Sequence, residues 1–281
     1  MTFRQKFHVL HGDVVLGAMA VSTLGSVALK ARPDIIWWLT LALSIWIAFT
    51  LQQLGDAWKH RKREKTAEHR FVLKNMSILL WLILLLGFID GLLIMNFLDR
   101  EVFRLALFIA GLGLLFAALR FLLRRSPYLR LPGELFALFF FMTGTWVGPW
   151  AAREVMVGNE VLAVFLMCAA VLFLKLGLVA MHSPAQKSRL GLPSLTVLLG
   201  MRSARHLLLG LVAAVLLLSL LQFMVWGTGL YFGLALILDG MAMLYLLMLL
   251  WPNAFGPDEW LCWWADLVPL MAFLSLAAKG L

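Results

Sequence analysis

Four ionisable side chains stand inside apolar runs, where a charge is energetically expensive: Lys175, Asp90, Asp239 and Asp266. A charged group in the middle of a membrane span costs at least about 2.5–3.5 kcal/mol, so such residues usually pair with one another or line a polar functional site. Two roles remain open for Lys175. Its ammonium either extends to the nearby interface or faces the interior, where we expect Asp266 or Asp239 as its ion-pair partner.

The other residues that could act in catalysis or bind a metal lack the spacing of a known catalytic or metal site. The histidines lie in the N-terminal tail, in loops or near the ends of apolar runs, at His8, His11, His60, His69, His182 and His206. A membrane haem needs axial ligands from facing helices at depth, so no haem is expected. Cys168 and Cys262 lie in apolar helical stretches without metal spacing and are interpreted as core residues. A glycine-rich phosphate loop and a Ser/His/Asp set are both absent from the sequence.

The composition excludes an ordinary soluble protein. Hydrophobic residues make up 63% of the chain and charged residues 14%, against roughly 45–50% and about 25% in soluble domains. The net charge of +9 is attributed to the positive-inside bias of membrane proteins rather than to a nucleic-acid partner. The sequence therefore predicts an all-α polytopic membrane protein.

Repeated apolar runs predict about nine transmembrane helices in a single domain, residues 1–281. The expected spans are 13–30, 34–55, 77–97, 102–123, 132–150, 159–181, 205–226, 229–250 and 260–278. No small-x-small cleavage site follows the first run, so that run is interpreted as a retained span. Pro132 and Pro149 stand at the ends of a predicted span, whereas Pro269 stands well inside one and predicts a kink in the last helix.

Lysine and arginine are concentrated in the N-terminal tail and in the loops after the second, fourth and sixth spans. This asymmetry places the N-terminus and those loops in the cytoplasm and the C-terminus outside, as for a protein of a bacterial cytoplasmic (inner) membrane. Two of these loops are long, at about 56–76 and 182–204. Long, matching loops in two halves of a chain indicate the side on which function resides.

Sequence around these loops resembles a divergent branch of the UbiA superfamily of intramembrane prenyltransferases. The resemblance rests on "FTLQQLGDAWKHRKREKTAEHRFVLKN", "LPGELFALFFFMTGT", "LFLKLGLVAMHSPAQKSRLGLPSL" and "ADLVPL". It implies a ring of nine helices around a central cavity open to lipid. It also implies two Asp-rich cytoplasmic motifs whose Mg²⁺ ions hold the diphosphate of a polyprenyl donor while the prenyl group passes to an acceptor.

The sequence departs from these motifs at most of the acidic positions. In the first motif the leading acidic position holds Gln52, the second holds Asp56, and the third falls near His60. In the second motif the acidic positions fall on His182 or Ser183 and on Lys187. A lysine ammonium does not bind Mg²⁺ and repels it. Ordinary two-metal prenyl transfer is therefore not expected, and Asp56 is the one candidate ligand for a single Mg²⁺ ion.

The resemblance and the charges inside spans together nominate a set of substrate-binding candidates. These are Gln52, Asp56, His69, Arg70, Lys175, Lys187 and Asp266. Asp56 has an alternative role as a solvated carboxylate paired with Lys59 or Arg63. The basic run 59–65 has two interpretations as well: it contacts lipid headgroups and sets topology, or its cations bind a diphosphate in place of Mg²⁺.

Three functions remain open at this level. The first is a UbiA-like protein with an isoprenoid-binding cavity and without Mg²⁺-diphosphate catalysis. The second is an active prenyltransferase with an altered diphosphate site. The third is a non-catalytic membrane subunit of a larger complex that binds lipid, quinone or pigment. The expected partners are membrane lipids, an isoprenoid or prenyl diphosphate and, for the third function, other membrane chains.

Overall fold

In this computed structural model the described residues are 7–59, 67–98, 100–108, 111–112, 133–153, 156–182, 195–227 and 229–278. Helices account for nearly all of them, and no strand occurs within these ranges. The helices that pack into the bundle are α2 (Gly12–Ala28), α3 (Ile35–Lys59), α5 (Met76–Phe97), α7 (Gly133–Ala151), α8 (Asn159–His182), α10 (Met201–Trp226), α11 (Leu230–Leu250) and α12 (Asp258–Leu267). The shorter elements are α4 (Ala67–Lys74), α9 (Leu195–Leu199), η2 (Pro252–Phe255), η3 (Val268–Leu274) and α13 (Ser275–Ala278).

The polytopic helical fold predicted from the apolar runs is confirmed. Six stretches of described helix are long and apolar enough to cross a membrane: Ile35–Gly55, Met76–Phe97, Asn159–His182, Met201–Trp226, Leu230–Leu250 and Trp260–Ala277. The first and fifth predicted spans correspond to the shorter apolar helix α2 and to α7. Of the fourth, residues 102–108 and 111–112 are helical and the rest lies outside the described part of the chain.

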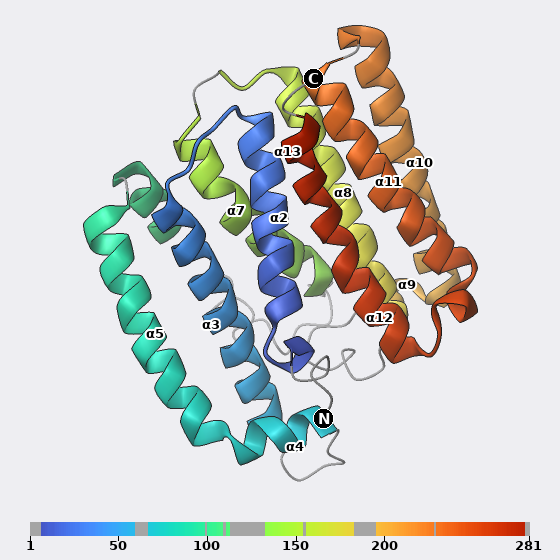
Figure 1. Ribbon diagram of the computed structural model, residues 1–281. Coiled ribbons are helices and arrows are strands. Elements are labelled where there is room, and N and C mark those ends of the chain that lie inside the picture. The colour runs from blue at the N-terminus through green and yellow to red at the C-terminus, as the bar shows by residue number, and fades with distance from the viewer. Residues whose placement is uncertain are drawn as a thin grey trace.

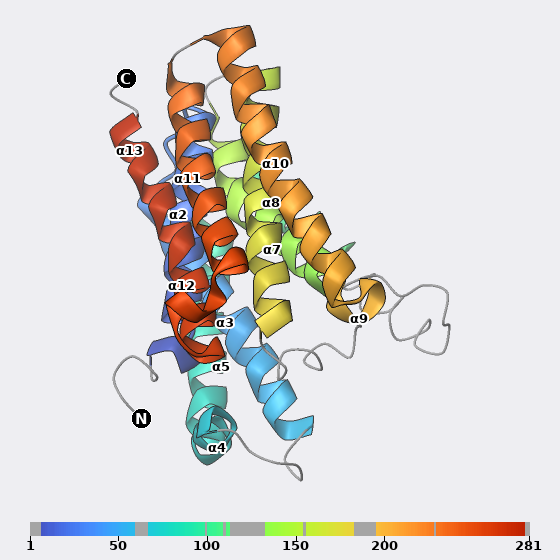
Figure 2. The same ribbon diagram turned by 90° about the vertical axis from the view of Figure 1, so that its right-hand side faces the viewer.

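Both long connections are partly helical rather than loops throughout. Helix α3 continues to Lys59, beyond its apolar run, so the backbone of Asp56 is helical. Polar residues continue a helix readily once it has left the hydrocarbon, which is why hydropathy alone ends a span too early. Helix α4, from the first connection, and α9, from the second, lie at the same end of the bundle (Figures 1 and 2). The distribution of lysine and arginine predicts this arrangement.

Helix α8 lies at the centre of the main core. Over an apolar stretch of 18 residues, 56% of the residues of α8 are buried, compared with 17% over such a stretch of α5. The core around α8 combines side chains of α2, α7, α10, α11 and α12, with fully buried members such as Leu24, Met167 and Leu238. Helix α5 lies at one edge of the bundle (Figure 1) and exposes Trp81 and Phe88. Such an apolar outer face suits a helix surrounded by hydrocarbon.

The N-terminal segment joins this core to the pair formed by α3 and α5. Val9 is buried against Leu54 and Ala57 of α3 and Val72 of α4. His11 has a left-handed backbone (φ 58°), a conformation in which histidine is found more often than most residues. Its N–H donates to the His8 carbonyl (3.0 Å), so the chain turns tightly just before α2. This turn positions residues 8–11 at the end of the bundle that carries α4 and α9.

The last span changes from an α-helix to a 3-10 helix next to Pro269, the residue at which the sequence predicts a kink. Helix α12 ends at Leu267, and the chain continues as the 3-10 helix η3 with Pro269 in its first turn. Proline lacks an N–H, so the carbonyl four residues earlier, that of Ala265, loses its helical donor. The Tyr245 hydroxyl of α11 donates to that carbonyl instead (3.1 Å). Pro269 therefore leaves the Ala265 carbonyl without a backbone donor in the core, and the Tyr245 hydroxyl supplies the hydrogen bond.

Candidate functional site

The two charges inside the spans of α8 and α12 form an ion pair. Lys175 Nζ lies 2.9 Å from Asp266 Oδ1, and the two side chains are only 13% and 14% exposed. Lys175 stands about two helical turns before His182, the last residue of α8. Its ammonium is paired inside the bundle rather than extended to the interface. This confirms the first of the two carboxylate partners expected from the sequence, Asp266.

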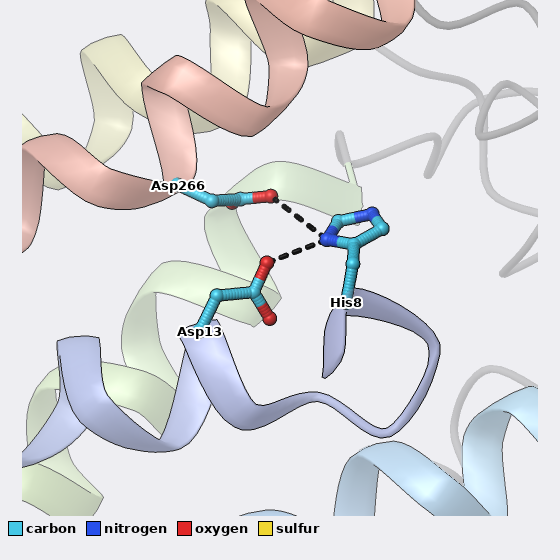
Figure 3. Close-up of side chains that lie close together, drawn as sticks. All are labelled: His8, Asp13 and Asp266. Carbon is cyan, nitrogen blue, oxygen red and sulfur yellow. Dashed lines mark hydrogen bonds and ion pairs between the residues drawn. The ribbon is translucent and has the colours of Figure 1, made fainter. Parts of the chain in front are cut away.

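A second acid and a histidine complete the cluster (Figure 3). His8 Nδ1 lies 2.5 Å from Asp13 Oδ2 and 3.8 Å from Asp266 Oδ2. The Asp13 side chain is fully buried, whereas that of His8 is partly exposed. Figure 3 shows one nitrogen of the His8 ring facing both carboxylates, which come from α2 and α12. We refer to His8, Asp13, Lys175 and Asp266 as the charged cluster.

Local sequence explains why His8 and Asp13 meet. Asp13 is in the first turn of α2, where the helix dipole and free N–H groups favour a carboxylate. Its Oδ1 accepts the N–H of Val14 (2.9 Å), which leaves Oδ2 directed at His8. Gly12 permits the turn before α2, because a Cβ at this position would overlap the Phe7 ring. The tight turn at 8–11 then places the His8 ring over Asp13.

Sequence reasoning missed His8 and Asp13 as site residues. His8 was assigned to a polar tail, since residues 1–12 precede the first apolar run. Asp13 stands at the beginning of that run, so the rule that marks Lys175 and Asp266 as costly charges in a span applies to it equally. His8 carried no comparable signal, because its place in the cluster depends on the turn and on α12, which is distant in sequence.

Asp90 and Asp239 are the other carboxylates inside spans. Asp90 of α5 is buried, and its Oδ2 accepts the Ser44 hydroxyl of α3 (2.6 Å). Its Oδ1 and the Oδ1 of Asp239 are buried and have no hydrogen-bond partner among the described residues. Asp239 was the alternative partner expected for Lys175, and the ion pair is made by Asp266 instead.

The structure describes the motif-derived candidates incompletely. Gln52 near the end of α3 and Arg70 in α4 are exposed. The side chains of Asp56 and His69, and all of Lys187, lie outside the described residues. Of the seven candidates, the structure therefore brings Lys175 and Asp266 together, and the roles of the others stay predictions.

The donor atoms at the motif positions do not fit the paired Mg²⁺ ions that the resemblance implies. Gln52 presents a neutral amide, and its side chain is exposed on α3. His182 ends α8 with an imidazole where a carboxylate is expected. Mg²⁺ is a hard ion that prefers oxygen ligands in near-octahedral geometry. Asp56 would be the one carboxylate available to it at these positions.

A different set of residues has donor atoms suited to a metal ion. One nitrogen of His8 and one carboxylate oxygen each of Asp13 and Asp266 lie within 4.8 Å of one another. These ligands come from the N-terminal turn, α2 and α12, and none belongs to the two motifs near 52–60 and 182–187.

No family model and no curated protein sequence matches the chain. Among solved structures, the chain is similar to one described as that of a digeranylgeranylglyceryl phosphate synthase in membranes. The similarity covers 99% of this chain and 100% of that chain, with 18% sequence identity and a TM-score of 0.49.

Proposed function

We propose that this chain is a UbiA-like integral membrane protein that binds an isoprenoid lipid, a polyprenyl compound or a quinone, without Mg²⁺-dependent diphosphate chemistry. The observation that carries the proposal is the Lys175–Asp266 pair on α8 and α12 (2.9 Å). Ligand sites for such molecules are mostly apolar and use a few polar groups to orient the ligand. The pair offers an N–H donor and a carboxylate acceptor to a hydroxyl or carbonyl headgroup. The surrounding helices offer apolar surface to the hydrocarbon chain of the lipid.

The chemistry of the motif positions argues against prenyl transfer. Departure of a diphosphate produces a highly charged anion, which divalent metal ions stabilise. Asp56 supplies one carboxylate for that purpose, and Lys187 supplies a repelling charge. The basic residues near Asp56 then serve the binding of anionic lipid headgroups. We place the N-terminus and this end of the bundle on the cytoplasmic side of a bacterial inner membrane.

The test combines lipid analysis with an activity assay on the full-length protein in mild detergent. We expect extraction and mass spectrometry to find an isoprenoid or quinone bound to the wild type and to Asp56→Asn. The amount should fall at least severalfold in the double variant Lys175→Met/Asp266→Leu, which removes both charges together. Arg202→Met, an exposed position on α10, is the matched surface control.

The same preparations are incubated with polyprenyl diphosphates and aromatic acceptors, with Mg²⁺ or with a chelator. We expect no Mg²⁺-dependent transfer. Turnover that disappears with chelator and in Asp56→Asn would contradict the non-catalytic function and support an active prenyltransferase with an altered site. An equal lipid content in wild type and double variant would contradict the assignment of the headgroup site.

A further inference from the structure

The geometry points to a binding site for a divalent first-row transition-metal ion, formed by His8 Nδ1, Asp13 Oδ2 and Asp266 Oδ2. One nitrogen of His8 and one oxygen of each carboxylate lie within 4.8 Å of one another, and the three residues come from parts of the chain that the fold brings together (Figure 3). Imidazole suits zinc, iron or copper better than Mg²⁺ or Ca²⁺, and carboxylates complete such sites. This inference uses none of the Asp-rich motif positions and does not rest on lipid binding, although Asp266 belongs to both proposed sites.

Each carboxylate directs one oxygen toward the proposed metal position, and its other oxygen is bonded to a group outside the proposed ligand set. Asp13 Oδ1 accepts the backbone N–H of Val14 at 2.9 Å, and Asp266 Oδ1 is bonded to Lys175 Nζ at 2.9 Å. In both residues Oδ2 is the atom directed at His8. Metal-ligating carboxylates are typically oriented by such outer partners, which makes the donor set pre-organised rather than accidental.

The spacing of the donor atoms is close to what a tetrahedral ion requires. With ligand bonds of about 2.0–2.2 Å, neighbouring donor atoms stand about 3.4 Å apart. The separations from His8 Nδ1 are 2.5 Å to Asp13 and 3.8 Å to Asp266, so they bracket this value. Changes of about 1 Å or less in these two separations would bring them to the spacing of a tetrahedral ion. A fourth position remains for water or an added ligand.

The charges of the cluster also favour an added cation. With a neutral imidazole, two carboxylates face one ammonium, and the cluster carries a net negative charge in a largely buried place. Lys175 does not occupy the ion's position, because its ammonium contacts Oδ1 of Asp266 rather than Oδ2. This differs from Lys187, which stands where a ligand itself is expected. Protonation of His8 is the competing way to neutralise the cluster, and metal binding distinguishes the two.

The test uses Co²⁺ alone as the probe, with purified full-length protein that carries no polyhistidine tag and has been stripped of metal. We expect about one more Co²⁺ per chain in the wild type than in His8→Ala, with the visible absorption of a four- or five-coordinate ion. Affinity should fall at least tenfold in His8→Ala and in Asp13→Asn. His206→Ala, which removes an exposed histidine of α10, should leave binding unchanged.

Two outcomes would overturn the site. One is equal Co²⁺ binding by wild type and His8→Ala. The other comes from X-ray absorption of the wild type loaded with one equivalent of Zn²⁺, which we expect to show a single imidazole nitrogen among oxygen ligands. A spectrum without imidazole would exclude this site even if the variants fail to fold. Lipid content is not a readout in either experiment, so the result does not depend on the proposed function.

Discussion

Lys175 Nζ lies 2.9 Å from Asp266 Oδ1, and this ion pair joins the central helix α8 to the last span. The pair is nearly enclosed, so each charge depends on the other for its solvation. Asp266 has a further neighbour in His8 at 3.8 Å, which links the same carboxylate to the N-terminal turn. Stability and ligand binding at this end of the bundle should therefore respond together to changes in the pair.

The two partners of the ion pair should contribute to stability jointly rather than independently. Lys175→Met leaves a buried carboxylate without its main counter-charge, and we expect a loss of about 2–3 kcal/mol. Lys175→Met/Asp266→Leu should cost less than the sum of the two single variants, by at least about 1 kcal/mol. Thermal or denaturant unfolding in detergent measures this, with Arg202→Met as control. Additive losses would show that the two side chains are not coupled.

Tyr245 should stabilise the protein through the carbonyl that Pro269 leaves without a helical donor. Tyr245→Phe removes the hydroxyl that donates to the Ala265 carbonyl (3.1 Å), and we expect a loss of about 1–2 kcal/mol because that buried acceptor loses its partner. Tyr231→Phe, at a half-buried position on the same helix, should cost less.

A second substitution tests whether the cost of Tyr245→Phe comes from the unpaired Ala265 carbonyl. Pro269→Ala adds a backbone N–H four residues after Ala265, the spacing of an α-helical hydrogen bond. Tyr245→Phe should therefore cost less when Pro269→Ala is present, as measured by the same unfolding transitions. An undiminished cost in the Pro269→Ala background would contradict the assigned role of the hydroxyl.

Two glycines one turn apart on α7 should respond in opposite directions to alanine. A Cβ at Gly148 would overlap the Trp37 indole of α3, which is buried and whose Nε1 donates to Ser22 Oγ (3.2 Å). We expect Gly148→Ala to destabilise by about 1–3 kcal/mol, as overpacking does. A Cβ at Gly144 meets nothing within 4 Å, so Gly144→Ala should be neutral or stabilise by up to about 1 kcal/mol. The melting temperatures of the two variants test this packing, and equal shifts would contradict it.

The orientation of the bundle is tested by labelling single cysteines in a background that lacks Cys168 and Cys262. Arg70→Cys, exposed on α4, should react with an impermeant thiol reagent only after the cells are opened. Arg153→Cys, exposed just after α7, should react in intact cells. The reason is the concentration of lysine and arginine on the side of α4. The reverse labelling pattern would place the N-terminus outside.

The sequence by itself determined the helical membrane architecture and the positions of most spans. Runs of apolar residues of a length that crosses a bilayer are local features, so α3, α5, α8, α10 and α11 were predictable within a few residues. The partner of Lys175 was partly predictable too, because a charge at depth requires compensation. The carboxylates inside other spans left Asp266 and Asp239 as its two expected partners.

Only the tertiary structure decided the rest of the site. His8 joins Asp13 because His11 adopts a left-handed turn that hydropathy does not encode. It approaches Asp266 because the last span packs beside the first. Whether Lys175 pairs with Asp266 or with Asp239 depended on which helix, α12 or α11, presents its carboxylate to α8 at the depth of Lys175. Such contacts arise from helix rotation and long-range packing, and the local pattern of apolar and polar residues leaves both undetermined.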